Sequence, residues 1–116
     1  MAGEAFILGL ALSRVHVSYA DELILELGAL RSPIAAAPDH LVGEWRVGTD
    51  DVNWELLDPS GARLAPIGPF WQPKVTAAWE PVLGATVVAV KRNGLRFSSG
   101  HVLRVSGDPG WSVQRG

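Results

Sequence analysis

Apolar and polar positions alternate most regularly in the last third of the chain, residues 84–116. Three clusters of turn-forming residues, at 93–94, 98–101 and 106–110, separate four short runs of β-branched or aromatic residues. The dipeptide Asn93-Gly94 is a strong hairpin signal, because a type I′ turn needs positive φ at both central positions. The pattern predicts an antiparallel meander of four strands.

The first thirty residues also have the period of strands. Apolar and polar residues alternate from 14 to 19, which is typical of a half-buried strand. After a turn at 20–21, leucines at 23, 25 and 27 alternate with Ile24 and Glu26 until Gly28. A helix over residues 22–30 is the alternative, since Leu and Glu are good helix formers. The alternation favours the strand.

The middle of the chain suggests one more hairpin, then a loop and a helix. Residues 42–47 and 52–57 alternate on either side of a turn at 48–51, which predicts a cross-strand pair of Trp45 and Trp54. A second turn at 58–61 leads into a loop to residue 73 that contains three prolines, residues that central strands exclude. Residues 74–83 have room for a short helix, limited by Pro81.

Length and composition fit one domain over residues 1–116. With 47% hydrophobic residues, a chain of this size buries a core without metals or disulfides. We predict an all-β to β-rich α+β fold, with short antiparallel strands from hairpins and at most one short helix near 74–83. The arrangement is left open between a single curved sheet, a small barrel and a sandwich.

Charge and cysteine usage exclude several classes of function. Ten basic and twelve acidic residues give a net charge of −2, whereas a nucleic-acid partner calls for a basic face. The absence of cysteine removes disulfides, thiolate zinc sites and a cysteine nucleophile. No apolar stretch approaches the roughly 20 residues of a membrane-spanning helix. We expect a cytoplasmic protein that binds neither nucleic acid nor membrane.

Residues with catalytic or metal-binding chemistry are scattered. The spacing of His16, His40 and His101 suggests no zinc site. The turn at 98–101 holds serines and a histidine, but neighbouring residues in a tight turn rarely bring hydroxyl and imidazole to working distance. Asp50 and Asp51, with acidic residues at 44, 55 and 58, suit turns or a carboxylate site. We expect no cofactor and no metal, and the residues do not favour an enzyme.

Aromatic and basic residues give the better candidates for binding. Phe70 and Trp71 lie in the proline-rich loop, where two adjacent large rings cannot easily both point inward. Arg96 and Arg104 alternate with apolar residues and should share the outer face of the last sheet. The candidate binding residues are Phe70, Trp71, Trp45, Trp54, Asp50, Asp51, Arg96 and Arg104.

Five segments together resemble a group of small β-rich bacterial proteins without an assigned activity. They are residues 15–28, with the pattern VxVSYADELxLxLG, 43–49, with GxWxVGT, 54–56, with WxL, 83–87, with LGxxV, and 95–111, which begins LxFxxGxxLxV. Some members of the group are suspected immunity-type partners of toxins. The resemblance implies a single β-rich unit and provides no catalytic residues.

Three hypotheses of function follow. The first is a non-catalytic module that binds another protein, through the aromatic loop and the acidic turn, or a second copy of itself through an unpaired edge strand. The second is a barrel that holds a small molecule between tryptophans. The third, which has least support, is an enzyme that uses carboxylates.

Overall fold

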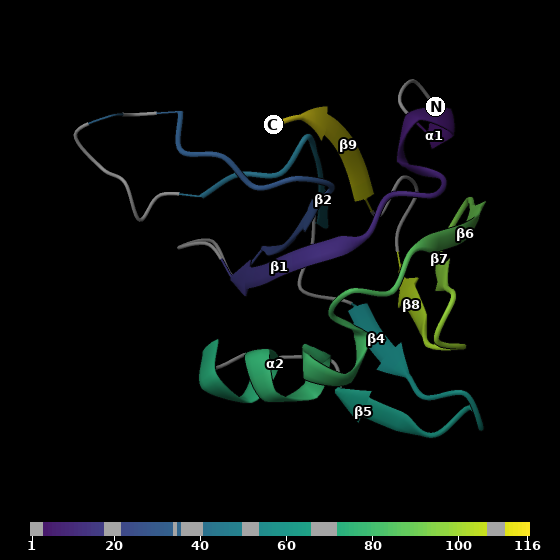
Figure 1. Cartoon of the computed structure of the whole chain (residues 1–116). Helices are drawn as coiled ribbons and strands as arrows, with labels where there is room; N and C mark the ends of the chain where they lie inside the picture. The colour runs from purple at the N-terminus through teal and green to yellow at the C-terminus, as the bar shows by residue number, and fades with distance from the viewer. Residues whose placement is uncertain are drawn as a thin grey trace.

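The computed structural model describes residues 4–17, 22–33, 35, 41–49, 54–65, 72–106 and 111–116. Two antiparallel sheets make up most of this part of the chain (Figure 1). The first sheet has the strand order β1-β2-β3-β9. Its strands are β1 (Leu12–Val17), β2 (Leu23–Leu27), β3 (Trp45–Thr49) and β9 (Trp111–Arg115). The predicted strand in residues 23–27 is therefore confirmed over the helical alternative.

The second sheet has the strand order β5-β4-β8-β7-β6. Its strands are β4 (Trp54–Leu57), β5 (Arg63–Ala65), β6 (Val87–Lys91), β7 (Gly94–Phe97) and β8 (Val102–Val105). The β-rich antiparallel fold is confirmed. The sequence left open a single curved sheet, a small barrel and a sandwich. The described strands form two sheets and not a single one.

Helices take up little of the described chain. α1 (Glu4–Ile7) is a single turn, and α2 (Gln72–Trp79) continues into the 3-10 turn η1 (Glu80–Val82). The short helix expected near 74–83 is confirmed, with its start two residues earlier. Pro81 lies near the start of η1, where its missing N–H removes no hydrogen bond. Among the described residues, no helix has both the length and the apolar character to cross a membrane.

The two sheets and α2 share one hydrophobic core. The leucines of β2 at 23, 25 and 27 are fully buried in it. Trp79 of α2 lies between two aromatic rings, with ring centroids 6.1 Å from Trp54 and 5.9 Å from Phe97. Large aromatic side chains contribute much of the buried apolar area of a small domain. Trp79 therefore joins the helix to the second sheet.

The hairpin predicted from residues 42–57 is wrong. β3 pairs with β2 and β9, whereas β4 pairs with β5 and β8, so the two strands belong to different sheets. Trp45 and Trp54 consequently form no cross-strand pair. Trp45 instead stacks on Phe6, with ring centroids 5.0 Å apart. A strand pairs with whichever partners bury its apolar face best, and among the partners of these two strands only β5 directly follows in sequence.

The predicted C-terminal meander is confirmed for three of its four strands. β6, β7 and β8 pair in order, but β9 joins β3 in the first sheet. The first turn is also shifted by one residue. Lys91 pairs with Gly94, so the turn residues are Arg92 and Asn93.

Gly94 serves close packing, since it lies outside the positive-φ region that the predicted turn required. A Cβ atom at this position would collide with the carbonyl oxygen of Leu103 on β8. Only glycine therefore fits where β7 begins.

The loop predicted from the end of the turn at 58–61 to residue 73 is wrong in two parts, because β5 pairs with β4 there and α2 already begins at Gln72. The turn before it is confirmed. The Asp58 carboxylate accepts hydrogen bonds from the N–H groups of Ser60 and Ala62, both at 2.9 Å. These bonds turn the chain so that residues 63–65 lie along the edge of β4.

Candidate functional site

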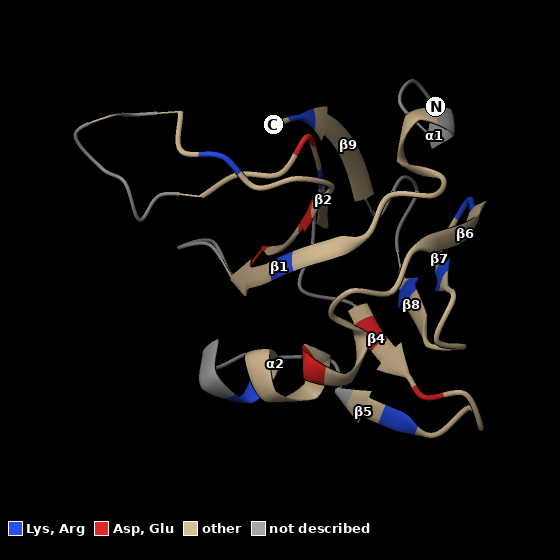
Figure 2. Ribbon diagram, in the orientation of Figure 1, with Lys and Arg blue, Asp and Glu red and all other residues tan. Residues whose placement is uncertain are grey.

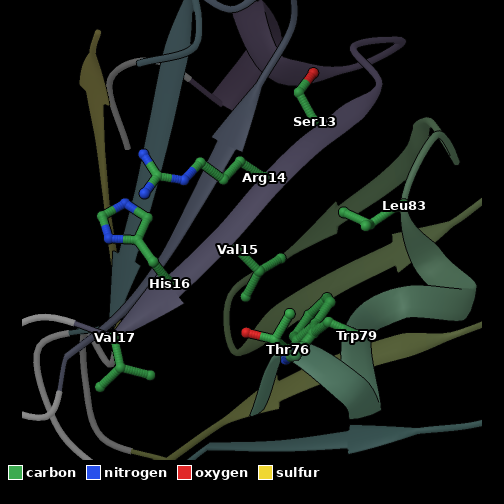
Figure 3. Close-up of a pocket in the computed structure, with 8 residues that line it drawn as sticks. All are labelled: Ser13, Arg14, Val15, His16, Val17, Thr76, Trp79 and Leu83. Atoms are coloured by element: carbon green, nitrogen blue, oxygen red, sulfur yellow. The ribbon is translucent and has the colours of Figure 1, made fainter. Parts of the chain in front are cut away.

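A groove of about 520 Å³ lies between β1 and the segment formed by α2 and η1. We call it the β1 groove. Its lining residues are Ser13, Arg14, Val15, His16, Val17, Thr76, Trp79 and Leu83. Figure 3 shows Val15 directed toward Trp79 and Thr76, whereas Arg14 and His16 project from the other face of β1. Five successive residues of one strand border the groove, so it follows the edge of β1.

This edge of β1 lies at the end of the first sheet, with β2 on its other side. Only its beginning is paired. Leu12 donates its N–H to the carbonyl of Ala85 and accepts the N–H of Gly84, both at 2.8 Å. From Ser13 to His16, no described strand pairs with this edge. Unpaired strand edges offer backbone donors and acceptors to a further strand.

A buried carboxylate lies on the face of the first sheet that faces away from the core. Glu26 of β2 is completely buried. Its carboxylate accepts hydrogen bonds from Nε of Arg46 at 2.9 Å and from the N–H of Gly43 at 3.1 Å. Nε2 of His16 lies 2.8 Å from one of the carboxylate oxygens. The cross-strand register produces this arrangement, because Glu26 pairs with Arg14 on β1 and with Arg46 on β3. Side chains of β1 (Arg14 and His16) and of β3 (Arg46) thus enclose the Glu26 carboxylate.

The pKa of Glu26 reflects two opposing effects. Burial alone would raise it, because desolvation disfavours the charged form. The hydrogen bonds from His16, Arg46 and Gly43, together with the charge of Arg46, outweigh burial and hold the pKa of Glu26 below its usual value. The carboxylate is therefore ionised at neutral pH and fixes the imidazole of His16 beside the β1 groove.

Arg14 is fixed by the chain that leads into β3. Its Nη1 donates to the carbonyl oxygen of Leu41 at 3.0 Å. This bond engages one nitrogen of the guanidinium, and the strand register places Arg14 opposite Glu26. The side chains of Arg14, His16 and Arg46 thus lie around the Glu26 carboxylate.

Four of the candidate binding residues, Phe70, Trp71, Asp50 and Asp51, lie outside the described residues. Trp54 is fully buried in the core and reaches no surface. Trp45 is partly exposed and packs against Phe6, which is 62% exposed. Among the described residues, the candidates are therefore not gathered into one site.

Arg96 and Arg104 lie on one outer face of the second sheet, as predicted. Both are exposed, while their neighbours Leu95, Leu103 and Val105 are buried. Figure 2 shows basic residues on β5, β7 and β8, with an acidic residue on β4 between them. That residue is Glu55, whose carboxylate forms ion pairs with Arg63 and Arg104. The outer face of the second sheet is therefore mainly basic but also contains the acidic residue Glu55.

The turn at 98–101 differs from the sequence-based expectation. The hydroxyl oxygen of Ser99 lies 2.8 Å from Nδ1 of His101, and the imidazole is buried. No carboxylate hydrogen-bonds this imidazole among the described residues, since Asp58 caps its own turn. The pair closes the turn and lacks the third group that orients a catalytic base. Elsewhere in the described ranges, no three metal-ligating side chains lie together.

Sequence reasoning missed Glu26, Arg46 and the role of His16. Because Glu26 alternates with leucines, the sequence pattern alone indicates an ordinary polar position on a strand. A signal did exist: a lone acid in an otherwise apolar strand lies between two strands that carry Arg and His. Charges of opposite sign on successive strands become neighbours when the strands pair in order. Comparisons with protein-family models, curated proteins and solved structures found no match for this chain.

Proposed function

We propose that this protein is a non-catalytic module that binds an extended segment of another protein. The segment adds a strand to β1 and lies in the β1 groove. The observation that carries the proposal is the position of the groove, which follows an unpaired strand edge between β1 and α2. In strand addition, backbone hydrogen bonds supply affinity and side-chain contacts on the two faces supply specificity.

The length of the edge limits the segment. Residues 13–16 border the groove along the part of the edge where no described strand pairs, so about four residues of a partner can pair, at about 3.3 Å per residue. Pairing cannot extend toward the start of β1, because Gly84 and Ala85 already occupy that edge. A bound segment therefore begins or ends beside Leu12.

The two faces of β1 favour different side chains in the partner. On one face, the added strand lies beside Arg14 and His16, where directly opposed acidic residues form cross-strand pairs. On the other face, it approaches Val15, Trp79 and Leu83, which is 44% exposed. The chemistry that fits is a short segment in which acidic and apolar residues alternate.

A groove-filling substitution tests the proposal. Thr76 is an exposed residue of α2 that lines the groove, and Ala77 is its exposed neighbour outside the lining. The probe is a displayed library of random twelve-residue peptides selected on the full chain. We expect the selected peptides to alternate acidic and apolar residues. Thr76→Trp should abolish their binding, whereas Ala77→Trp should leave it within about twofold of wild type, as is usual for a surface substitution.

Hydrogen exchange locates the bound peptide. Strand addition protects those backbone amides of residues 13–16 that point away from β2, because the other amides of β1 already face β2. Equal binding to both tryptophan variants, or protection confined to other strands, would refute the proposal. If the chain self-associates and Thr76→Trp prevents this, the segment that binds β1 comes from a second copy of the chain and not from another protein.

A further inference from the structure

A second and separate hollow lies on the outer face of the other sheet. It has a volume of about 160 Å³, and we call it the Gly94 hollow. Its lining residues are Lys91, Asn93, Gly94, Leu95, Arg96, Val102, Leu103 and Arg104. The lining contains three basic residues and no acidic residue.

The register of β6, β7 and β8 creates this hollow. Gly94 pairs with Lys91 on one side and with Arg104 on the other. Because Gly94 has no side chain, no side chain separates Lys91 from Arg104 across β7. A Cβ at Gly94 would collide with the Leu103 carbonyl, so the chain cannot fill that position with a larger residue. Arg96 follows two residues later on the same strand.

The nearby acidic residues are already occupied. Glu55 lies beside Arg104 and is shared between it and Arg63. The Asp58 carboxylate accepts hydrogen bonds within its own turn, from Ser60 and Ala62. Neither carboxylate lines the hollow, but Glu55 neutralises Arg104 from β4, so the uncompensated charge of the lining belongs to Lys91 and Arg96.

The donors of the hollow are partly fixed. Nε of Arg104 lies 2.6 Å from a carboxylate oxygen of Glu55, which holds the guanidinium in place beside the hollow. Lys91 and Arg96 make no ion pair with any described residue. Arginine, lysine and the Asn93 amide together offer donors from three strands and the turn between two of them.

We propose that the Gly94 hollow binds a phosphate group. Lys91 and Arg96, the two lining cations without an ion pair among the described residues, match the charge near −2 of a tetrahedral phosphate group, and Arg104 and the Asn93 amide offer further donors to its oxygens. A carboxylate has one charge and two oxygens in a plane, so it would leave cationic groups of the hollow unmatched. The site lies on the second sheet and does not depend on the proposed role of the β1 groove.

Titration of the isotopically labelled full chain tests this site. The probes are inorganic phosphate, methyl phosphate and acetate at constant ionic strength, observed through the backbone amide signals of residues 93–96. We expect saturable binding of phosphate with a Kd on the order of 1 mM, and acetate about tenfold weaker. Tighter binding of methyl phosphate would identify a phosphate monoester as the ligand, and tighter binding of inorganic phosphate the free ion.

Matched variants separate the hollow from general charge. Arg96→Gln removes a cation that lines it, and Arg63→Gln removes a cation from the same face outside it. We expect Arg96→Gln to weaken phosphate binding about tenfold and Arg63→Gln less than twofold. Lys91→Gln should repeat the loss, which keeps the test valid if one variant folds poorly. Equal losses at residues 63 and 96, shifts that never saturate, or acetate binding as tight as phosphate would overturn the proposal.

Discussion

The buried carboxylate of Glu26 provides the sharpest test of the structure. Glu26→Gln preserves the shape of the side chain but removes its charge. The amide oxygen can still accept the Gly43 N–H, whereas the ion pair with Arg46 and the charge-assisted bond to His16 are lost. Both partners keep some access to water, because Arg46 is 29% and His16 22% exposed. That access limits the loss to part of the full cost of breaking a buried ion pair.

We expect Glu26→Gln to lower the free energy of unfolding by about 2 kcal/mol at pH 7, close to the value of one hydrogen bond to a charged group. For a chain of this length, that loss lowers the Tm by roughly 8 °C. Urea unfolding measures the free energy directly. Glu44→Gln serves as the control, since Glu44 is exposed and its carboxylate accepts only the Ala29 N–H among the bonds described. Its expected cost is below about 0.5 kcal/mol.

The difference between wild type and Glu26→Gln should depend on pH. The pKa of Glu26 is lower in the folded than in the unfolded chain, so the folded state is favoured wherever the carboxylate is ionised. This contribution is fully present above the unfolded pKa of about 4.3 and is lost as the pH falls through the folded value. We expect the two free energies of unfolding to converge as the pH falls below the unfolded pKa of about 4.3. A difference that is equal at pH 7 and pH 3, or absent at pH 7, would refute the reasoning.

Two further predictions concern packing. Trp79→Ala should cost about 4 kcal/mol in urea unfolding because Trp79 is fully buried, and Trp45→Ala on the partly exposed ring should cost about 1 kcal/mol. Equal costs would contradict the assigned core. Gly94→Ala should cost more than about 2 kcal/mol because its Cβ meets the Leu103 carbonyl, and Gly61→Ala, with positive φ and open space around it, about 1 kcal/mol. The opposite order of the two Tm values would show that Gly94 has room for a side chain.

Local pattern was enough to predict most strands and their buried faces. The alternation in residues 23–27 and in 95–105 depends on each strand alone, and the buried leucines and outward arginines are where it places them. The short helix near 74–83, limited by Pro81, was likewise predicted from its own residues. These features need no knowledge of what lies across the sheet.

Pairing between distant strands was not predictable in the same way. β3 and β4 are neighbours in sequence, yet β3 pairs with residues 23–27 and 111–115, and β4 pairs with residues 102–105 as well as with the adjacent β5. The burial of Glu26 depends on such pairing, because its partners belong to β1, to β3 and to the chain just before β3. An acid between leucines looks solvent-exposed until the residues that cover it are known.

The position of β9 also constrains the order in which the chain folds during synthesis. β3 is completed by pairing with β9, and Trp45 opposes Arg115 across about 70 residues of intervening chain. The first sheet therefore stays incomplete until residues 111–115 have been made, after every strand of the second sheet. Contacts between such distant residues raise the contact order and slow folding. In the growing chain, the unpaired edge of β3 is the segment that most needs protection from aggregation.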